Sequence, residues 1–480
     1  MNSGWLTIMP NSTQQWPKII PGSRAKKRVL VVLGILGYVA FFQWMYVIYL
    51  YPFWGYFGFD YNPPGRGYIA LAWCLSVIPS LWMPVDLNRP SQLAYWVLYV
   101  TVTIPSMFVP LYAGLNSPYE IIYLLLALFA GLAIAGSSYL FPLFRIHPPR
   151  IPPRLFWLVV GCLTAGLSLW MAVVFRHHLR IVSFQDAYDV RTAASDVAEG
   201  SQVNYAFTLL TAAIYPFLMG LGLYRKRRWL FFAGVLGQVL VYSIEGTKGS
   251  VSSILFIVAF YFLLRAGRTW FAPKLAWSAL LLLAVLCFSL FVAGYDPGPL
   301  LSTLLFVLLM RTLSINGLLT AQYYKFFQHN PLTYFSHIKG VNWILAYPYK
   351  YTVGQEIGLA YVGSIDLDAT AHFWATDGIG GLGLPGVLLM SVFCAVVFWI
   401  LDSASQRHDP RLVALVSAYG AFNLANISLF TSLCSGGLAL LILLLYLMPS
   451  QSAQGSASRR VANPQVSLVP LLPKPSPVAQ

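Results

Sequence analysis

The sequence predicts an all-α, polytopic integral membrane protein. Of its 480 residues, 58% are hydrophobic and 16% are aromatic, whereas 9% carry a charge. A soluble domain has about 25% charged residues, so this chain has too few charges to build an ordinary water-facing surface. The mean hydropathy of +0.67 agrees with many membrane spans. A soluble globular enzyme and a disordered chain are excluded, and with only five cysteines so is a disulfide scaffold.

Long apolar runs, separated by charged or Pro- and Gly-rich loops, can each cross a hydrocarbon core about 30 Å thick. We expect about twelve membrane-spanning helices, near residues 29–52, 68–85, 93–114, 120–141, 155–175, 203–224, 229–244, 251–264, 275–293, 382–401, 411–428 and 433–449. The stretch 299–320 begins apolar but contains Arg311. We expect a re-entrant or interfacial segment there, because a full crossing would move every later loop to the opposite side.

The positions of the basic residues orient the chain. Five Lys and Arg residues precede the first span, and they mark the N-terminal side as cytoplasmic. With that orientation, most of the 30 Lys and Arg face the cytoplasm and most of the 15 Asp and Glu face outward. Membrane topology therefore accounts for most of the net charge of +15, and nucleic-acid binding is not needed to explain it.

These expectations divide the chain into five parts with both termini in the cytoplasm. They are a cytoplasmic N-terminal segment (1–28), spans one to nine with an outer loop at 176–202 (29–298), the re-entrant segment with a large outer loop (299–381), spans ten to twelve (382–449) and a cytoplasmic tail (450–480). The tail is rich in Ser, Pro, Gln and Ala, a composition typical of disorder.

The large outer loop carries side chains suited to sugars. Tyr323 and Tyr347 could stack on sugar rings, while Lys350 and Glu356 could bond to hydroxyl groups. The alternative for each Tyr is an interfacial aromatic belt. Ionisable residues are nearly absent from the interiors of the spans, and this favours chemistry at the outer face over transport through the membrane.

Two further features could bind an anion. The turn that begins at Glu245 and reads Glu-Gly-Thr-Lys-Gly-Ser has two glycines that let backbone N–H groups approach a phosphate, and Lys248 adds a positive charge. Arg311 follows an apolar stretch, and its planar guanidinium suits a pair of phosphate oxygens. The alternatives are a tight turn with a Glu245–Lys248 pair and an interfacial anchor at Arg311.

Several short motifs resemble those of Wzy-type polymerases, the bacterial O-antigen and exopolysaccharide repeat-unit polymerases. The stretch Ala-His-Phe-Trp-Ala-Thr-Asp at 371–377 and the apolar span that ends in Asp402 resemble the C-terminal signature of that family. Upstream, the pattern that runs from Arg311 through Tyr323 to His337 is similar, as is the turn at Lys248. The resemblance covers about residues 240–405.

The resemblance implies a GT-C-like glycosyltransferase in the bacterial inner membrane. Its substrates would be oligosaccharide repeat units carried on undecaprenyl diphosphate, and it would transfer the growing chain to the incoming unit at the periplasmic face. The implied partners are these lipid-linked oligosaccharides, membrane lipids and a chain-length regulator. We expect no cofactor, no metal and no nucleic acid.

In that chemistry Arg311 and Lys248 would stabilise the negative charge that develops on the leaving diphosphate. Either His372 or Asp377 would take the proton of the acceptor hydroxyl. Two other functions stay open at this point. One is an O-antigen ligase-like glycan transferase, which shares the chemistry, and the other is a lipid-linked oligosaccharide flippase or another transporter.

Overall fold

The computed structural model describes residues 21–145, 147–149, 151–177, 203–246, 248–265, 267–294 and 297–449. The expectations for residues 1–20, for the outer loop at 178–202 and for the tail at 450–480 lie outside this part of the chain. Within it, all regular structure is helical, which confirms the all-α prediction.

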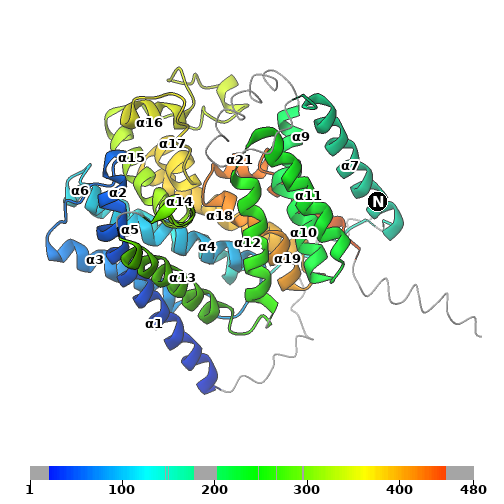
Figure 1. The fold of residues 1–480 in the computed structure, drawn as a ribbon, viewed down its shortest axis with the longest axis horizontal. Helices are drawn as coiled ribbons and strands as arrows, with labels where there is room; N and C mark the ends of the chain where they lie inside the picture. The colour runs from blue at the N-terminus through cyan, green and yellow to red at the C-terminus, as the bar shows by residue number, and fades with distance from the viewer. Residues whose placement is uncertain are drawn as a thin grey trace, which may run out of the picture.

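Figure 1 shows the helices, and η marks short segments wound more tightly or more widely than an α-helix. The first group is α1 (Pro21–Met45), η1 (Tyr46–Leu50), α2 (Tyr51–Trp54), η2 (Gly55–Phe57), α3 (Arg66–Val77), η3 (Ile78–Leu81), α4 (Ser91–Leu98), η4 (Tyr99–Thr103), α5 (Ile104–Ala113), α6 (Pro118–Gly136) and η5 (Ser137–Leu140). The second is α7 (Pro153–Val174), α9 (Val203–Leu209), η6 (Leu210–Ile214), α10 (Tyr215–Tyr224), α11 (Arg228–Glu245), α12 (Lys248–Arg265) and α13 (Phe271–Ala293). The third is α14 (Gly298–Leu305), η7 (Phe306–Ser314), α15 (Ile315–His329), η8 (Val341–Trp343), α16 (Val353–Val362), η9 (Trp374–Ile379), α17 (Gly380–Leu382), α18 (Leu384–Ala404), α19 (Pro410–Val416), α20 (Ala418–Leu424), α21 (Leu429–Leu433) and α22 (Leu438–Leu447).

In the described residues, nine helical stretches are long and apolar enough to cross a membrane, the pattern of a multi-pass membrane protein. They are Arg24–Phe57, Ser91–Ala113, Pro118–Leu140, Pro153–Val174, Tyr205–Tyr224, Phe271–Ala293, Gly298–His329, Leu384–Ala404 and Leu429–Leu447. Two shorter apolar helices, Arg66–Leu81 and Gly249–Arg265, correspond to two more of the expected spans. The expected number of twelve is not confirmed.

The expected span at 411–428 is interrupted near its middle. Helix α19 ends at Val416 and α20 begins at Ala418, with Ser417 between them. The Ser417 hydroxyl lies 2.8 Å from the carbonyl oxygen of Val413 and 3.3 Å from that of Ala414. A serine that binds backbone carbonyls in this way often bends a helix, a feature that hydropathy alone does not detect.

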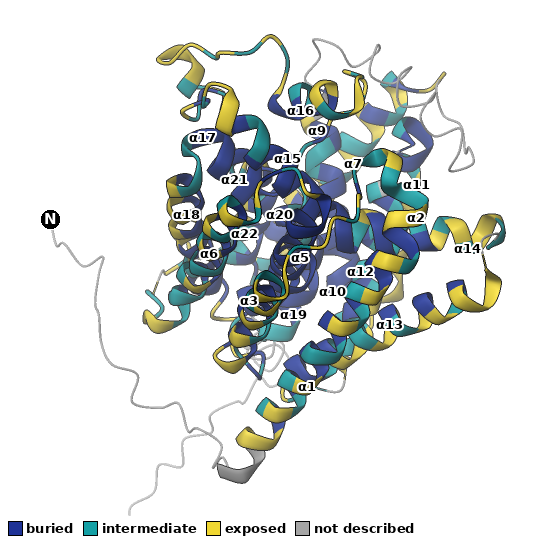
Figure 2. Cartoon of the chain, turned by 90° about the vertical axis from the view of Figure 1, so that its left-hand side faces the viewer, coloured by how far each residue is buried: buried dark blue, intermediate teal, exposed yellow. Residues whose placement is uncertain are grey.

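The segment expected to re-enter the membrane forms part of one continuous helix, Gly298–His329, which has 32 residues and is apolar enough to cross. Its middle third, η7, is π-helical, and the hydroxyls of Thr312 and Ser314 each donate to a carbonyl five residues earlier at 2.7 Å. Arg311 lies on the exposed side of η7, so its charge does not interrupt the helix. In Figure 2, α14 begins at one edge of the molecule and leads inward to α15. By length and composition this helix could cross a membrane, and the expected re-entrant segment stays a prediction.

Every residue of α4, η4 and α5 is buried, so the core lies around these elements. Figure 2 shows buried residues gathered around α5. Helix α15 packs against α5, and α18 packs against α6 and η9. The contact between α15 and α5 is close at Gly317, where a Cβ atom would lie 2.7 Å from the carbonyl oxygen of Pro105. In contrast, α7 is largely exposed at the periphery (Figure 1).

Candidate functional site

A hydrogen bond between a histidine and a buried aspartate joins two segments of the region between α15 and α18. Nε2 of His337 lies 3.0 Å from Oδ1 of Asp377. The Asp377 side chain is fully buried, whereas 10% of the His337 side chain is exposed. The pair thus has a carboxylate sealed from solvent and an imidazole with a small exposed part.

Two further donors hold the Asp377 carboxylate. The Ser428 hydroxyl donates to Oδ1 at 2.6 Å, and the backbone N–H of Leu429 donates to Oδ2 at 2.7 Å. Ser428 also caps α21, because its hydroxyl accepts from the N–H of Thr431. A buried carboxylate without such partners would be costly, so this set of donors allows Asp377 to remain in place.

The second ring nitrogen of His337 faces a hydroxyl. Nδ1 lies 2.9 Å from Oγ1 of Thr333, which also lies 2.9 Å from the carbonyl oxygen of Gly380. An ionised Asp377 only accepts hydrogen bonds, so it keeps a proton on Nε2. When Nδ1 is bare, the Thr333 hydroxyl can donate to it. When Nδ1 carries a proton, that hydroxyl can accept from it and donate to Gly380. The site is therefore satisfied before and after His337 gains a proton.

The backbone that presents His337 is strained. Tyr334 and Phe335 have φ angles of +48° and +64°, in the left-handed region that residues with a Cβ atom rarely adopt. Each such residue costs about 1–3 kcal/mol and persists only where its surroundings impose it. Here the N–H of Tyr334 donates to the carbonyl of Gly381 at 3.1 Å, and the Phe335 ring packs on that glycine.

Glycines set the position of Asp377. A Cβ atom on Gly386 would lie 2.1 Å from the carbonyl oxygen of Gly378, so the start of α18 can touch η9 only if residue 386 is glycine. Gly383, at the turn between α17 and α18, has φ +66° and ψ −146°, a conformation open essentially only to glycine. Together these residues fold η9 back on α18 and carry Asp377 to Ser428.

His372 occupies a different environment from His337. It is fully buried, its Nε2 lies 2.8 Å from Oγ1 of Thr320, and its Nδ1 has no hydrogen-bond partner. Burial lowers the pKa of His372 to about 3. A neutral, enclosed imidazole cannot meet an acceptor hydroxyl without rearrangement. Of the two residues predicted as the base, Asp377 is the one that contacts a partly exposed histidine, His337.

Three of the predicted sugar-binding residues gather around Tyr351. The Tyr347 hydroxyl donates to the Tyr351 carbonyl at 2.9 Å, Glu356 accepts from the Tyr351 N–H at 3.0 Å, and the Lys350 ammonium lies 5.0 Å from the centre of the Tyr351 ring. Burial, and then the nearby Glu356 carboxylate, raise the pKa of Tyr349 to about 12.

Tyr323 does not belong to this surface. Its side chain is fully buried, and its hydroxyl donates to the carbonyl of Ala369 at 3.2 Å. Nor does Tyr323 belong to an interfacial aromatic belt, because its ring does not reach the surface. Tyr323 ties α15 to the segment that leads into η9.

The predicted phosphate-binding residues lie on other elements. Arg311 is exposed on η7, Glu245 is the half-buried last residue of α11, and Lys248 is the first residue of α12. Gly246, with φ +62°, ends α11 and forms part of the predicted turn. The structure thus brings together His337 with Asp377 and, separately, the Tyr351 group.

His337, Thr333 and Ser428 were not among the predicted site residues. His337 lies in the stretch that resembles the polymerase family, as Asp377 does. A contact between these two residues could therefore have been predicted from the sequence. Ser428 stands immediately before a short apolar helix, where a capping residue is expected. In the part of the chain that the structure describes, no group of three or more His, Cys, Asp or Glu side chains could hold a metal ion.

Comparison of the chain with protein-family models, with curated proteins and with solved structures gives no match.

Proposed function

We propose that the protein is a membrane glycosyltransferase that joins undecaprenyl-diphosphate-linked oligosaccharide repeat units into a surface polysaccharide. The observation that carries this proposal is the His337–Asp377 pair, in which each ring nitrogen of His337 has a hydrogen-bond partner. General-base catalysis of transfer to a hydroxyl needs such a group, and its pairing with a carboxylate is a recurrent solution.

In the proposed reaction, the acceptor hydroxyl of one lipid-linked unit attacks the anomeric carbon of the donor sugar. The Thr333 hydroxyl first turns its proton toward the carbonyl of Gly380 and leaves the lone pair of Nδ1, which then takes the proton of the acceptor hydroxyl. The bond between the anomeric carbon and the diphosphate oxygen breaks, and the diphosphate leaves on its lipid. Asp377 stabilises the imidazolium that forms. Arg311 and Lys248, the cations predicted for the leaving group, lie on other elements, η7 and α12.

Contacts at one end of the molecule support an orientation for this site. Lys27, near the start of α1, pairs with Asp86 at 2.9 Å. Ser91, a few residues later, binds Asp402 near the end of α18. Arg407 then donates to the carbonyl of Tyr446 near the end of α22. The N-terminal end of α1 and the C-terminal end of α22, which are the first and last described helices, therefore lie at the same side of the molecule.

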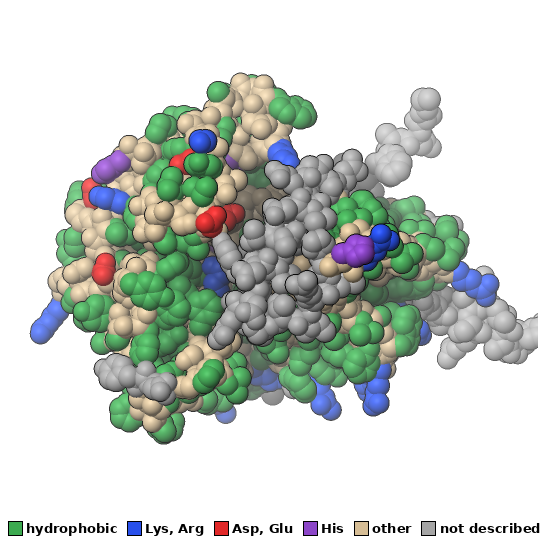
Figure 3. Space-filling view, turned by 45° about the horizontal axis from the view of Figure 1, so that its top comes forward, with side chains coloured by type: hydrophobic (Ala, Val, Ile, Leu, Met, Phe, Trp, Pro, Cys, Tyr) green, Lys and Arg blue, Asp and Glu red, His purple; other side chains and the backbone are tan. Residues whose placement is uncertain are grey.

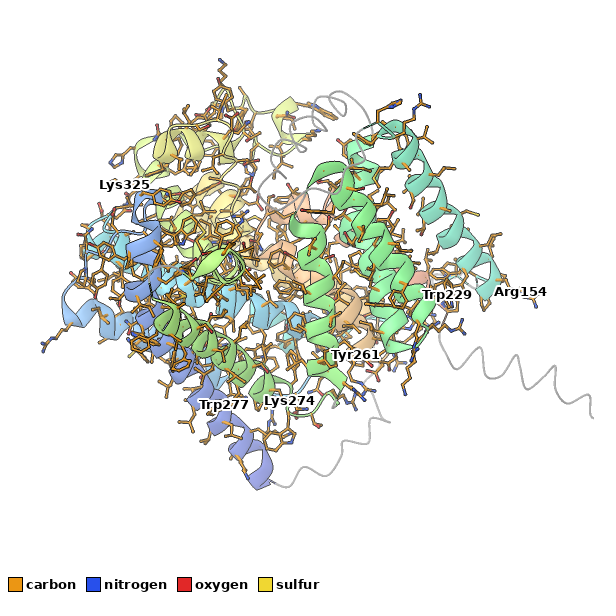
Figure 4. All side chains as sticks on the ribbon, in the orientation of Figure 1. Arg154, Trp229, Tyr261, Lys274, Trp277 and Lys325 are labelled. Carbon is orange, nitrogen blue, oxygen red and sulfur yellow. The ribbon has the colours of Figure 1, made fainter. Side chains whose placement is uncertain are left out.

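The distribution of charge supports the same orientation. In Figure 3, Lys and Arg side chains line the lower edge, where no Asp or Glu is visible, whereas Asp and Glu lie higher up with other Lys and Arg side chains among them. In Figure 4, Lys274 and Trp277 on α13 lie at the lower end and Lys325 on α15 lies at the upper end. We propose that the basic end, with both termini, faces the cytoplasm of a bacterium and that the His337–Asp377 site faces the periplasm.

Deletion of the gene, followed by gel analysis of surface glycan, tests the function. Single repeat units on the lipid, without a ladder of longer products, are expected for a polymerase. Intact polymer beside an unmodified acceptor would instead indicate a ligase. Repeat units retained in the cytoplasm would indicate a flippase.

The catalytic pair can be tested in the same cells. His337→Gln should reduce polymer formation by at least about a hundredfold, because general-base catalysis is lost. His329→Gln is the matched control, since His329 is exposed at the end of α15. A normal ladder from His337→Gln, at an unchanged protein level, would remove this pair from the mechanism.

A further inference from the structure

An apolar groove lies between α7 and α9. Its volume is about 340 Å³, within the range of small-molecule pockets, and its lining residues are Leu167, Trp170, Tyr205, Ala206 and Leu209. Helix α7 is the most exposed of the nine candidate spans, so the groove lies at the lipid-facing periphery of the protein.

A cation stands at the rim of the groove. The Lys339 ammonium donates to the hydroxyl of Tyr205 at 3.1 Å and lies 5.6 Å from the centre of its ring. One bond to Tyr205 leaves two ammonium protons for an anion. Lys339 also follows His337 by two residues, so the segment that presents the proposed base is the one that carries this cation to the groove.

We propose that this groove holds part of the hydrocarbon chain of a polyprenyl diphosphate and that Lys339 binds its phosphate groups. The inference rests on the proposed function and deepens it by assigning the site of the lipid carrier. A polyprenyl-diphosphate sugar has an apolar chain, an anion and a sugar in that order. The groove, Lys339 and His337 offer an apolar wall, a cation and a base in the same order.

The two parts of the site play different physical roles. Lipid tails are as apolar as the groove, so transfer from the bilayer into the groove gains little hydrophobic free energy and the groove mainly sets the position of the chain. Lys339 supplies the attraction, through charge-assisted hydrogen bonds to phosphate oxygens. The turn after Lys339 also exposes Trp343 and Ile344, to 89% and 85%, and such side chains favour a lipid environment over water.

Native mass spectrometry of the purified full-length protein with a polyprenyl diphosphate tests the proposal, with phosphatidylglycerol as competitor. Lys339→Gln should weaken retention of the polyprenyl diphosphate about tenfold. Leu167→Trp, which fills the groove, should weaken it several-fold. The matched control is Leu169→Trp, two residues away on α7, because Leu169 is 67% exposed and does not line the groove.

Equal retention by Leu167→Trp and wild type would overturn the proposal, as would equal displacement by phosphatidylglycerol, which would show that the groove holds bulk lipid. Leu209→Phe provides a second groove variant if Leu167→Trp does not fold. His337→Gln separates this inference from the proposed function. It should retain polyprenyl diphosphate but lose transfer, so a failure of the lipid site and a failure of the catalytic pair give different results.

Discussion

Two buried aspartates in this protein have nearly the same hydrogen-bond partners and differ in one. Asp402 accepts from the N–H of Ser91 at 3.0 Å and from the Ser91 hydroxyl at 2.7 Å. Asp377 accepts from the N–H of Leu429 at 2.7 Å and from the Ser428 hydroxyl at 2.6 Å. Each carboxylate is held at the first residues of a helix, but Asp377 alone of the two also binds a histidine, His337.

This difference separates a structural carboxylate from one that can support proton transfer. Asp402 joins the end of α18 to the start of α4, and the Ser91 hydroxyl that it binds is also 3.2 Å from the Tyr139 hydroxyl. That arrangement holds helices together. At Asp377 the same kind of fixed carboxylate orients an imidazole that is partly exposed and lies on strained backbone. The rigid support is common to both regions, and the histidine is the added chemical group.

The largest expected effect comes from Asp377→Asn. The amide can donate a hydrogen bond to Nε2 of His337, which would favour the opposite tautomer and remove the basic nitrogen at Nδ1. We expect glycan transfer to fall by about 10²–10⁴-fold. The measurement is the rate of polymer formation in membranes supplied with lipid-linked repeat units.

Asp402→Asn is the matched control for that variant. It also replaces a buried carboxylate with an amide, but it lies beside no histidine of the proposed site, so transfer should remain within a few-fold of wild type. Equal losses in the two variants would indicate that a buried carboxylate matters here only for folding, and the distinction between the two regions would fail.

The two serines provide a second test, with a smaller effect. Ser428→Ala and Ser91→Ala each remove one hydroxyl from a buried carboxylate, which should lower the free energy of unfolding by about 1–3 kcal/mol. Thermal denaturation in detergent measures this loss. Only Ser428→Ala should also slow transfer, because it loosens the carboxylate that orients His337. A slower rate in Ser91→Ala at a temperature where it is folded would contradict this expectation.

The sequence predicted the helical, membrane-spanning fold because apolar content and run length are local properties. It did not predict the break at Ser417, because that break depends on how a side chain binds backbone carbonyls. In the site, Asp377 was predicted from its motif. Its partner was not, because His337 reaches it through two left-handed residues, Tyr334 and Phe335, that no periodic pattern encodes.

Thr333→Val tests the other side of the imidazole. Valine keeps the shape of the side chain but removes the hydroxyl that faces Nδ1, so the protonated state of His337 loses its acceptor. We expect transfer to slow about tenfold. Thr333→Ser retains the hydroxyl and should restore most of the rate. If valine and serine variants are equally active, the Thr333 hydroxyl has no part in proton transfer.

His372→Gln should have the smallest effect, and that effect concerns stability instead of transfer. Because burial lowers the pKa of His372 to about 3, the folded protein keeps this ring neutral while the unfolded chain binds a proton below its ordinary pKa of 6.5. His372 therefore reduces stability as the pH falls from 6.5 toward 3, and it contributes nothing to the pH dependence above that window. At pH 6 the penalty is roughly 1 kcal/mol, and His372→Gln lacks it. His408, whose pKa burial lowers to about 4, contributes equally to wild type and to His372→Gln.

The fall in melting temperature between pH 7.5 and pH 6 should thus be smaller in His372→Gln than in wild type or in His329→Gln, while the transfer rate at pH 7.5 stays near that of wild type. If His372→Gln instead abolished transfer and left the pH dependence of melting unchanged, the enclosed histidine, and not His337, would be the base.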